Sequence, residues 1–272
     1  MKTRVAINGF GRIGRNAFKV AYERKDIEVV ALNDLTDTKM LAHLLKYDTN
    51  YGQFAHEVSF DENHLILDGV KIPVFKERDP AALPWGEHKV DVVIESTGFF
   101  VKSEAAKAHV QAGAKRVVIS APAKDDGAET IVIGANESAL EGSEAVVFSN
   151  ASCTTNSLAA VMDALEREIG IEKAMMTTVH SYTADQRLQD APHGDYRRAR
   201  AAAQNIIPTT TGAAIAVTKT VPSLTGKFDG MAIRVPTSVV SVSDVTMLLK
   251  ADTTEDELKD KLREACKQPY YQ

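Results

Sequence analysis

The feature that most constrains the fold is a glycine run between a predicted strand and a predicted helix near the start of the chain. Residues 3–8 (TRVAIN) are expected to form a short buried strand, and residues 9–14 (GFGRIG) follow it directly. A helix is expected from there to about residue 22. A second strand, residues 27–32 (IEVVAL), ends beside Asp34. Strand, glycine turn, helix and a strand that ends at an acidic residue form the unit that binds dinucleotides.

Each glycine has a physical reason in this unit. Gly9 permits the tight turn, Gly11 lets the backbone approach a pyrophosphate, and Gly14 lets the helix pack closely on the strand. Asp34 would accept hydrogen bonds from ribose hydroxyls and repel a 2′-phosphate, and no arginine follows it directly. The unit therefore predicts NAD rather than NADP as the cofactor. The alternative is a turn that needs glycines for packing alone, and the complete strand–helix–strand context disfavours it.

Short apolar segments alternate with helical ones through residue 149. Strands are predicted over residues 90–95, 116–120, 130–133 and 146–149, and helices over residues 38–46 and 103–112. This alternation predicts βαβ units and a mostly parallel sheet, which is the α/β class with a Rossmann-type architecture.

The pattern changes beyond residue 153. Longer strands are predicted over residues 174–182, 231–235 and 239–250, with an extended loop over residues 183–208 and a helix over residues 254–267. Their partial alternation is typical of a sheet with one solvated face. The chain is therefore expected to hold an NAD-binding domain, residues 1–152, and an α+β domain with a mixed or antiparallel sheet, residues 153–272.

Composition excludes several classes of protein. The 272 residues are 44% hydrophobic and 25% charged, and their net charge of −5 argues against general nucleic-acid binding. No apolar run reaches the roughly 18 residues of a membrane helix, and the first residues lack the pattern of a secretory signal. The two cysteines, Cys153 and Cys266, have no metal-ligand spacing. No metal site is expected. The low cysteine content predicts a reducing, cytoplasmic location.

Residues 149–156 (SNASCTTN) join a predicted strand to an amphipathic helix, and they carry Cys153. The thiol therefore lies at a helix N-terminus, where free N–H groups and the helix dipole favour an anion. These groups lower the pKa of the thiol. The same position suits a phosphate, with hydroxyl donors from Ser152, Thr154 and Thr155. The alternative is a small cysteine that packs a strand–helix turn.

This octapeptide resembles the active-site signature of the phosphorylating glyceraldehyde-3-phosphate dehydrogenases, and the resemblance covers the whole chain. Other segments similar to that family follow in the family's order: INGFGRIGR at 7–15, ALND at 31–34, LAHLLKYD at 41–48, ERDP at 77–80, ESTGFF at 95–100, ISAPAK at 119–124, TTVHSYTADQR at 177–187, RRARAAA at 197–203, IIPTTTGAA at 206–214 and RVPT at 234–237. On these motifs the chain is identified as a member of the family, of the bacterial, NAD-dependent type.

The resemblance implies the oxidative phosphorylation of D-glyceraldehyde 3-phosphate to 1,3-bisphosphoglycerate, a glycolytic reaction. Cys153 would be the nucleophile that becomes a thioester, and His180 the base that keeps it a thiolate. Two other functions stay open. One is an erythrose-4-phosphate dehydrogenase, and the other is a catalytically impaired NAD-binding fragment of the family.

The resemblance also assigns ligands to particular residues. The substrate phosphate would bind Thr183, Arg198 and Arg234; the attacking phosphate would bind Ser152, Thr154, Thr211 and Gly212. NAD would contact Gly9, Gly11, Arg12, Ile13, Gly14, Asp34, Arg78, Ser96 and Ser120. The family resemblance implies a homotetramer if the fold is completed. Arg197 and Arg200 are expected in salt bridges at a subunit contact, and the alternative for the arginine cluster is a solvated basic face.

Two departures from the family pattern affect these expectations. Ser157 stands where many family members have a second cysteine, which removes a thiol that could resolve an oxidised Cys153. The chain stops at Gln272, well short of the family's usual length, so a C-terminal truncation is expected. Further strands, an asparagine that holds the nicotinamide carboxamide and a final helix would then be missing. Cys266 is expected to be an inert packing residue on the last helix. The histidines other than His180 are expected to be surface or packing residues.

Overall fold

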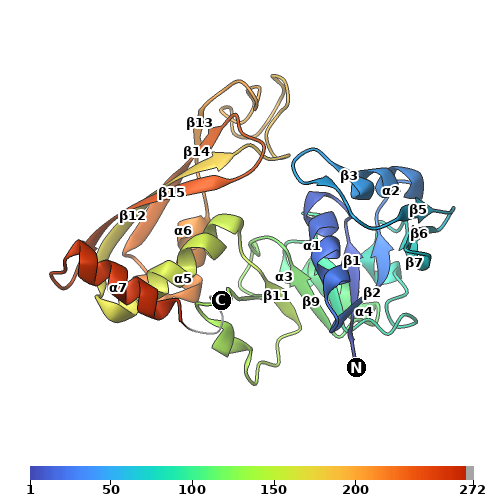
Figure 1. The fold of residues 1–272 in the computed structure, drawn as a ribbon, viewed down its shortest axis with the longest axis horizontal. Helices are drawn as coiled ribbons and strands as arrows, with labels where there is room; N and C mark the ends of the chain where they lie inside the picture. The colour runs from blue at the N-terminus through green and yellow to red at the C-terminus, as the bar shows by residue number, and fades with distance from the viewer. Residues whose placement is uncertain (268–272) are drawn as a thin grey trace. The chain divides into compact units, whose positions relative to one another are not determined.

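The computed structural model describes residues 1–267, and the end of the expected catalytic domain, residues 268–272, lies outside the described part (Figure 1). The chain forms two compact units. Among the described residues, the first comprises residues 1–130 and 142–150, and the second comprises residues 131–141 and 151–267. The expected domain boundary between residues 152 and 153 stays a prediction.

The first unit is built on a sheet in the order β10-β11-β9-β8-β1-β2-β7-β6-β5 among the described residues. Its strands are β1 (Thr3–Asn8), β2 (Ile27–Asn33), β5 (Val58–Phe60), β6 (His64–Leu67), β7 (Val70–Phe75), β8 (Val92–Glu95), β9 (Arg116–Ile119), β10 (Glu129–Thr130) and β11 (Val147–Ser149). Neighbours from β10 to β7 pair in parallel, and β7, β6 and β5 pair antiparallel. This confirms the α/β class.

The helices of the first unit connect these strands. They are α1 (Arg12–Glu23), α2 (Thr38–Lys46), α3 (Ser103–Ala106), α4 (Ala108–Gln111) and the 3₁₀ helix η1 (Pro80–Ala82), with a small hairpin of β3 (Tyr47–Asp48) and β4 (Gly52–Gln53). The single helix expected over residues 103–112 is therefore two short helices that meet at Lys107. The strand expected over residues 130–133 is only the two-residue β10.

Strand β1 shows why this sheet needs apolar residues on both faces. Val5 and Ile7 belong to a core cluster with Phe18 of α1, whereas Ala6 belongs to a separate cluster with Trp85. Successive side chains of a strand point to opposite faces, so a strand covered on both sides has no polar alternation. The run TRVAIN follows this rule.

The second unit holds a mixed sheet in the order β13-β14-β12-β15 among the described residues. Its strands are β12 (Ile171–Ser181), β13 (Ile207–Thr209), β14 (Phe228–Val235) and β15 (Ser241–Leu249); its helices are α5 (Cys153–Glu168), α6 (Ala213–Thr220), α7 (Glu255–Ala265) and the 3₁₀ helices η2 (Glu137–Leu140) and η3 (Pro222–Leu224). Strands β12 and β14 run parallel, and the other two pairs run antiparallel. This confirms the expected mixed sheet.

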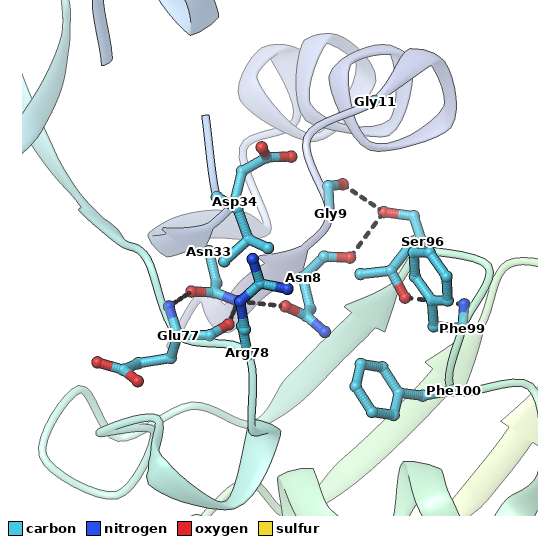
Figure 2. Close-up of a pocket in the computed structure, with 12 residues that line it drawn as sticks. Asn8, Gly9, Gly11, Asn33, Asp34, Glu77, Arg78, Ser96, Phe99 and Phe100 are labelled. Carbon is cyan, nitrogen blue, oxygen red and sulfur yellow. Dashed lines mark hydrogen bonds between the residues drawn. The ribbon is translucent and has the colours of Figure 1, made fainter. Parts of the chain in front are cut away.

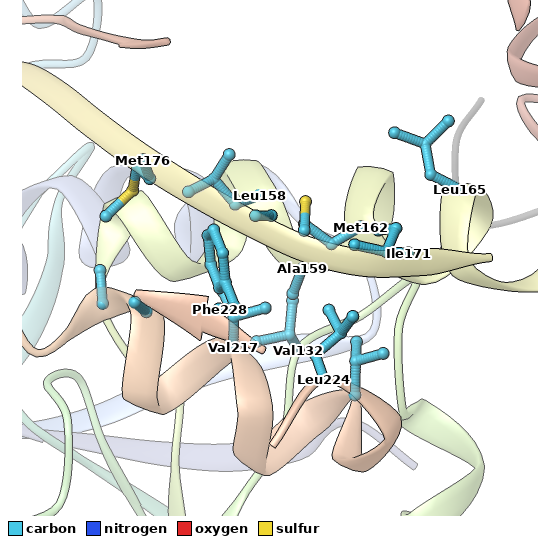
Figure 3. Packing of buried hydrophobic residues seen from close by; sticks show 14 of the residues in the cluster. Val132, Leu158, Ala159, Met162, Leu165, Ile171, Met176, Val217, Leu224 and Phe228 are labelled. Atoms are coloured by element: carbon cyan, nitrogen blue, oxygen red, sulfur yellow. The ribbon is translucent and has the colours of Figure 1, made fainter. Parts of the chain in front are cut away.

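The core of the second unit lies between this sheet and helices α5 and α6. Figure 3 shows Leu158, Ala159 and Met162 of α5 packed with Met176 of β12 and Phe228 of β14. Met175, one residue before Met176, is 67% exposed because alternate strand residues face away from the helices. Met231 and Val242 are also exposed.

Among residues 1–267, no helix combines the length and the apolar character needed to cross a membrane.

Candidate active site

Cys153 is the first residue of helix α5, as its sequence context predicts. Ser152 caps the helix, and its Oγ accepts a hydrogen bond from the Thr155 backbone N–H at 3.0 Å. Ala151, just before the cap, has φ +53°, a left-handed conformation that is costly for a residue with a Cβ atom. The Cys153 side chain is solvent-accessible, so a ligand can reach the sulfur.

His180 lies against this sulfur. Its Nε2 is 3.2 Å from Cys153 Sγ, and its Nδ1 is 2.7 Å from the Ser181 carbonyl oxygen. Because a carbonyl only accepts, Nδ1 carries a hydrogen, and Nε2 is left to exchange a proton with the sulfur. The structure therefore brings the two predicted catalytic side chains together.

The electrostatics of this pair favour a charged state. The hydrogen bond to His180 lowers the pKa of Cys153 from the ordinary thiol value, against the opposing effect of burial. The hydrogen bond to Cys153 raises the pKa of His180, again against burial. Both shifts stabilise a thiolate beside an imidazolium, which is the reactive form of a nucleophilic cysteine.

Arg234 reaches the same end of the second sheet because β14 pairs in parallel with β12, in a register that sets Arg234 opposite His180. Its Nη1 donates to Thr183 Oγ1 at 3.0 Å. Burial lowers the pKa of Arg234, and the neighbouring charge of Arg198 lowers it further. Its buried Nε has no hydrogen-bond partner among residues 1–267. An anion could use this donor.

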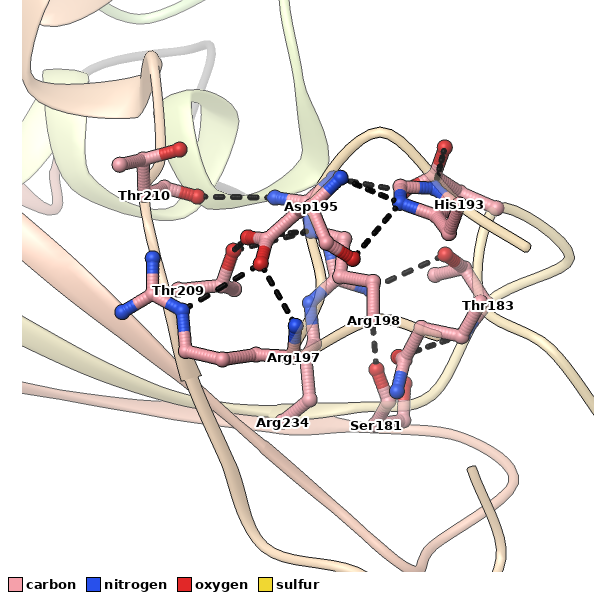
Figure 4. Close-up of polar contacts among 11 residues, drawn as sticks. Ser181, Thr183, His193, Asp195, Arg197, Arg198, Thr209, Thr210 and Arg234 are labelled. Atoms are coloured by element: carbon pink, nitrogen blue, oxygen red, sulfur yellow. Dashed lines mark hydrogen bonds and ion pairs between the residues drawn. The ribbon is translucent and has the colours of Figure 1, made fainter. Parts of the chain in front are cut away.

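Arg198 is held in place by three partners, two of which, Thr209 and Thr210, are labelled in Figure 4. Its Nη1 donates to Asp185 at 2.5 Å, its Nε to Thr209 Oγ1 at 2.9 Å, and its Nη2 to the Thr210 carbonyl oxygen at 3.0 Å. A guanidinium has five N–H donors, so two remain for a ligand. Arg198 is close enough to Arg234 for its charge to affect it, and Arg234 contacts Thr183. The three residues that were predicted as one anion site are therefore neighbours.

The second predicted anion site lies where two helices begin. Thr155 Oγ1 in the first turn of α5 donates to the Ala213 carbonyl oxygen, the first residue of α6, at 3.5 Å. Gly212 is the residue before α6, and Thr211 Oγ1 accepts from the Ala213 N–H at 3.2 Å. The predicted set Ser152, Thr154, Thr211 and Gly212 thus flanks two adjoining helix N-termini, which attract anions.

The first unit contains a cavity of about 490 Å³ at the carboxyl ends of β1, β2 and β8 (Figure 2). The residues that line it are Asn8, Gly9, Gly11, Asn33, Asp34, Leu35, Glu77, Arg78, Ser96, Thr97, Phe99 and Phe100. Five of the predicted cofactor residues are therefore in the wall: Gly9, Gly11, Asp34, Arg78 and Ser96. Carboxyl ends of parallel strands are where open α/β sheets bind their ligands.

The other predicted cofactor residues lie outside this wall. Arg12 forms an ion pair with Asp48 at 2.7 Å, and Ile13 is 56% exposed. Ser120 donates its backbone N–H to the Glu95 carbonyl oxygen at 2.9 Å. Gly14 packs against the backbone of Gly9.

The glycines fit the roles that the sequence assigned to them. Gly9 has φ +88°, and a Cβ there would lie 2.7 Å from the Thr97 backbone nitrogen. A Cβ on Gly14 would lie 2.0 Å from the Gly9 carbonyl oxygen, so only glycine fits. Gly11 has nothing within 4 Å of its Cβ position, which leaves the start of α1 open to a ligand.

Comparisons with known proteins agree with this geometry. The family model described as "Glyceraldehyde 3-phosphate dehydrogenase, NAD binding domain" matches residues 3–103, and the model of the C-terminal domain matches residues 152–272. Glyceraldehyde-3-phosphate dehydrogenase 1 of Bacillus subtilis is 54% identical over 97% of this chain and 79% of its own length. The relative from Geobacillus stearothermophilus is 55% identical with the same coverage. The chain belongs to the glyceraldehyde-3-phosphate dehydrogenase family.

The residues of this family member fit NAD at the cavity. Asp34 accepts the Phe10 N–H at 2.7 Å on one carboxylate oxygen and the Thr36 N–H at 2.9 Å on the other. Each oxygen keeps a lone pair that a ribose hydroxyl can use. Together with the open Gly11 position at the start of α1, this donor and acceptor set suits an adenosine ribose and a pyrophosphate.

Sequence reasoning missed several residues of this family member's cavity. Asn8 and Asn33 line it, and each is the last residue of a buried strand. A polar residue that ends an apolar strand was the available signal, because such positions face the ligand in an open parallel sheet.

Three further residues with predicted roles, Arg197, Arg200 and Cys266, lie outside the cavity wall. Arg197 and Arg200, expected at a subunit contact, pair within the chain with Asp195 and Asp190. Cys266 is exposed rather than packed. Among residues 1–267, no group of three or more His, Cys, Asp or Glu side chains could hold a metal ion.

Proposed function

We propose that this family member oxidises and phosphorylates D-glyceraldehyde 3-phosphate to 1,3-bisphosphoglycerate, with NAD as the oxidant, as a step of glycolysis. The observation that carries the proposal is the 3.2 Å approach of His180 Nε2 to Cys153 Sγ at the start of α5. The relatives named glyceraldehyde-3-phosphate dehydrogenase support the choice of aldehyde.

In the first step, the Cys153 thiolate attacks the aldehyde carbon and forms a carbon–sulfur bond. The carbonyl oxygen becomes an oxyanion and takes the proton of His180 Nε2, which gives a hemithioacetal. The backbone N–H groups at the start of α5 and the His180 side chain can stabilise the charge that develops on this oxygen. The predicted anion site of Thr183, Arg198 and Arg234 would hold the substrate phosphate meanwhile.

In the second step, His180 takes the hydroxyl proton back while a hydride leaves the same carbon, so the carbonyl re-forms as a thioester on Cys153. NAD, when bound, supplies the acceptor for that hydride. The residues that would hold NAD are Gly9, Gly11, Asp34, Arg78 and Ser96. An oxygen of inorganic phosphate then attacks the thioester carbon, and Cys153 leaves as a thiolate. The residues that would position that phosphate are Ser152, Thr154, Thr211 and Gly212.

We also propose a homotetramer in the cytoplasm. The exposed apolar side chains Met175, Met231 and Val242 on the second sheet support self-association, because contiguous apolar surface marks interaction sites. Cys153 carries an accessible free thiol, which is suited to a reducing compartment. The domain division at residues 152 and 153 belongs to the same proposal.

The test is NADH formation at 340 nm from glyceraldehyde 3-phosphate, NAD and phosphate. Wild type should turn over, Cys153→Ser should lose activity, and the matched Cys266→Ser should keep it. Without phosphate, NADH should stop after about one equivalent per site, because the thioester accumulates. A higher kcat/KM for erythrose 4-phosphate would support the alternative dehydrogenase. NAD binding without turnover of either aldehyde would contradict the proposed reaction.

A further inference from the structure

Three neighbouring strands of the first sheet end in polar side chains that the proposed reaction does not use. Asn33 ends β2, Asn8 ends β1 and Glu95 ends β8. The strand register pairs Asn8 with both of the others. All three are almost fully buried, although a buried polar group is costly unless its hydrogen bonds are satisfied. We call these three residues the polar row.

The polar row is hydrogen-bonded from end to end. Asn33 Nδ2 donates to Asn8 Oδ1 at 2.7 Å, and Asn8 Nδ2 donates to Glu95 Oε2 at 2.6 Å. Each amide and carboxylate is thereby fixed by its neighbour, which fixes the orientation of all three side chains.

Each end of the polar row holds one wall of the cofactor cavity. At one end, Glu95 Oε1 accepts the Thr97 N–H at 2.8 Å and the Thr97 hydroxyl at 2.5 Å. Thr97 Oγ1 in turn accepts the Phe99 N–H at 3.1 Å. At the other end, Asn33 accepts the Glu77 N–H at 2.8 Å and donates to the Glu77 carbonyl oxygen at 2.9 Å. Thr97, Phe99 and Glu77 all line the cavity.

A buried histidine supports the acidic end of the polar row. Trp85 Nε1 donates to His109 Nδ1 at 2.9 Å, and His109 Nε2 lies 2.9 Å from Glu95 Oε2. An indole N–H can only donate, so Nδ1 of His109 is an acceptor and the ring hydrogen sits on Nε2. His109 therefore donates to Glu95 as a neutral ring of defined tautomer.

Four donors thus converge on the two oxygens of Glu95: the Thr97 N–H, the Thr97 hydroxyl, the Asn8 amide and His109 Nε2–H. An ionised carboxylate offers about four lone pairs and no hydrogen, so it can accept all of them. A carboxamide of the same shape accepts at one oxygen only and points its own hydrogens at two donors. The position requires a carboxylate for geometric reasons.

We propose that Glu95 is a positioning residue for the cofactor: through the polar row it fixes the spacing between the Thr97–Phe99 wall and the Glu77–Arg78 wall of the cavity. His109 and Trp85 hold Glu95 in place. The proposal rests on the proposed use of NAD at this cavity. It assigns a function to a buried carboxylate and a buried histidine that take no part in the chemistry at Cys153.

The test compares Glu95→Gln with Glu62→Gln, a change at an exposed residue of the same unit. Calorimetric titration with NAD should show affinity reduced roughly tenfold or more in Glu95→Gln, since buried donors lose their acceptors. Glu62→Gln should match wild type. In turnover assays, the KM for NAD should rise in Glu95→Gln, while kcat at saturating NAD and the KM for the aldehyde stay within about twofold.

A general loss of structure would change these quantities differently. It would lower kcat and raise both KM values together, and that result would overturn the proposal. NAD affinity of Glu95→Gln within about twofold of wild type would overturn it as well. Failure of wild type to bind NAD at all would instead contradict the proposed function, so the two failures can be told apart.

A second variant covers the case in which Glu95→Gln does not fold. Thr97→Val keeps the shape of a half-buried side chain but removes the hydroxyl that links Glu95 to Phe99. It should weaken NAD binding and leave the alkylation rate of Cys153 unchanged; unchanged NAD affinity would contradict the proposal. Long-range ¹H–¹⁵N NMR on wild type should show His109 as the Nε2–H tautomer. A hydrogen on Nδ1 would contradict the inferred network.

Discussion

At the scale of single residues, the pairing of Cys153 with His180 decides the chemistry. The hydrogen bond between them lowers the pKa of the thiol and raises that of the imidazole. An ordinary thiol is mostly protonated near neutral pH, and pairing with a cationic ring at a helix start shifts the equilibrium toward the thiolate. Of the two accessible cysteines, Cys153 should therefore be much the more reactive nucleophile in the protein without bound ligand.

Iodoacetamide should alkylate Cys153 much faster than Cys266 at about pH 7, because only the thiolate reacts. His180→Asn should slow the reaction at Cys153 alone, since it removes the bond that lowers the pKa. Peptide mass spectrometry after timed quenching gives both rates in one sample. Equal rates at the two cysteines would contradict the ion pair.

His56 gives a second prediction at this scale. Its two ring nitrogens lie 2.7 Å from Glu23 and 2.7 Å from Asp68, and the hydrogen bond to Glu23 is the main cause of its raised pKa. A histidine whose pKa is higher when folded stabilises the protein fully below its unfolded pKa. That contribution is lost as the pH rises through the folded value. His56→Gln should therefore lower the free energy of unfolding more at about pH 5.5 than at about pH 8.5. Urea titrations at both values measure this, and an equal loss at both would count against it.

At the scale of elements, the glycine turn before α1 contains one glycine that is required for packing and another that is required for NAD binding. Gly14→Ala should destabilise the first unit and abolish NAD binding, because its Cβ would lie 2.0 Å from the Gly9 carbonyl oxygen. Gly11→Ala should keep the melting temperature and weaken NAD binding, because its Cβ enters the open space of the cavity. Thermal unfolding and NAD titration of both variants decide, and equal melting temperatures would refute the distinction.

Helix α5 offers a matched pair within one element. Met162 is fully buried in the core of the second unit, and Val161 beside it is 42% exposed. Met162→Ala should cost about 2–5 kcal/mol of unfolding free energy, as deletions in a packed core do. Val161→Ala should cost less than about 1 kcal/mol. Denaturant unfolding followed by far-ultraviolet circular dichroism measures both, and similar costs would be inconsistent with this packing.

The sequence predicted the elements whose signals are local. The turn at Gly9 to Gly14 and the helix that begins at Cys153 each depend on a few adjacent residues, and both were predicted correctly. Arg234 beside His180 depends on a parallel pairing between β12 and β14, and only the family resemblance supplied it. The polar row was missed because its members are adjacent only after three separate strands have paired.

At the scale of the whole molecule, the two units have separate cores. One core cluster joins α5, α6 and the second sheet, and two others lie in the first unit. Val132 packs in the core of the second unit, although it lies among residues that precede Cys153 by about twenty positions. Such long-range packing cannot be derived from the periodicity of a single segment, so the sequence could not predict it.

The proposed assembly gives a prediction at this scale. Met175→Glu places a charge on the exposed apolar side of the second sheet, where it would be desolvated in a contact between copies. Sedimentation velocity should show smaller species for Met175→Glu than for wild type. Glu172→Gln, at an exposed position on the same strand, is the control and should match wild type. A mass unaffected by Met175→Glu would contradict self-association through this face.

Trp85, the donor to His109, is the single tryptophan of the chain, and it lies in the first unit. Tryptophan emission, excited at a wavelength that tyrosine does not absorb, is therefore a local probe: it follows the unfolding of the first unit and does not report directly on the second. Circular dichroism, in contrast, averages over both. Coincident transitions by the two methods would show that the units unfold as one cooperative system, and an offset between them would measure how independently each one melts.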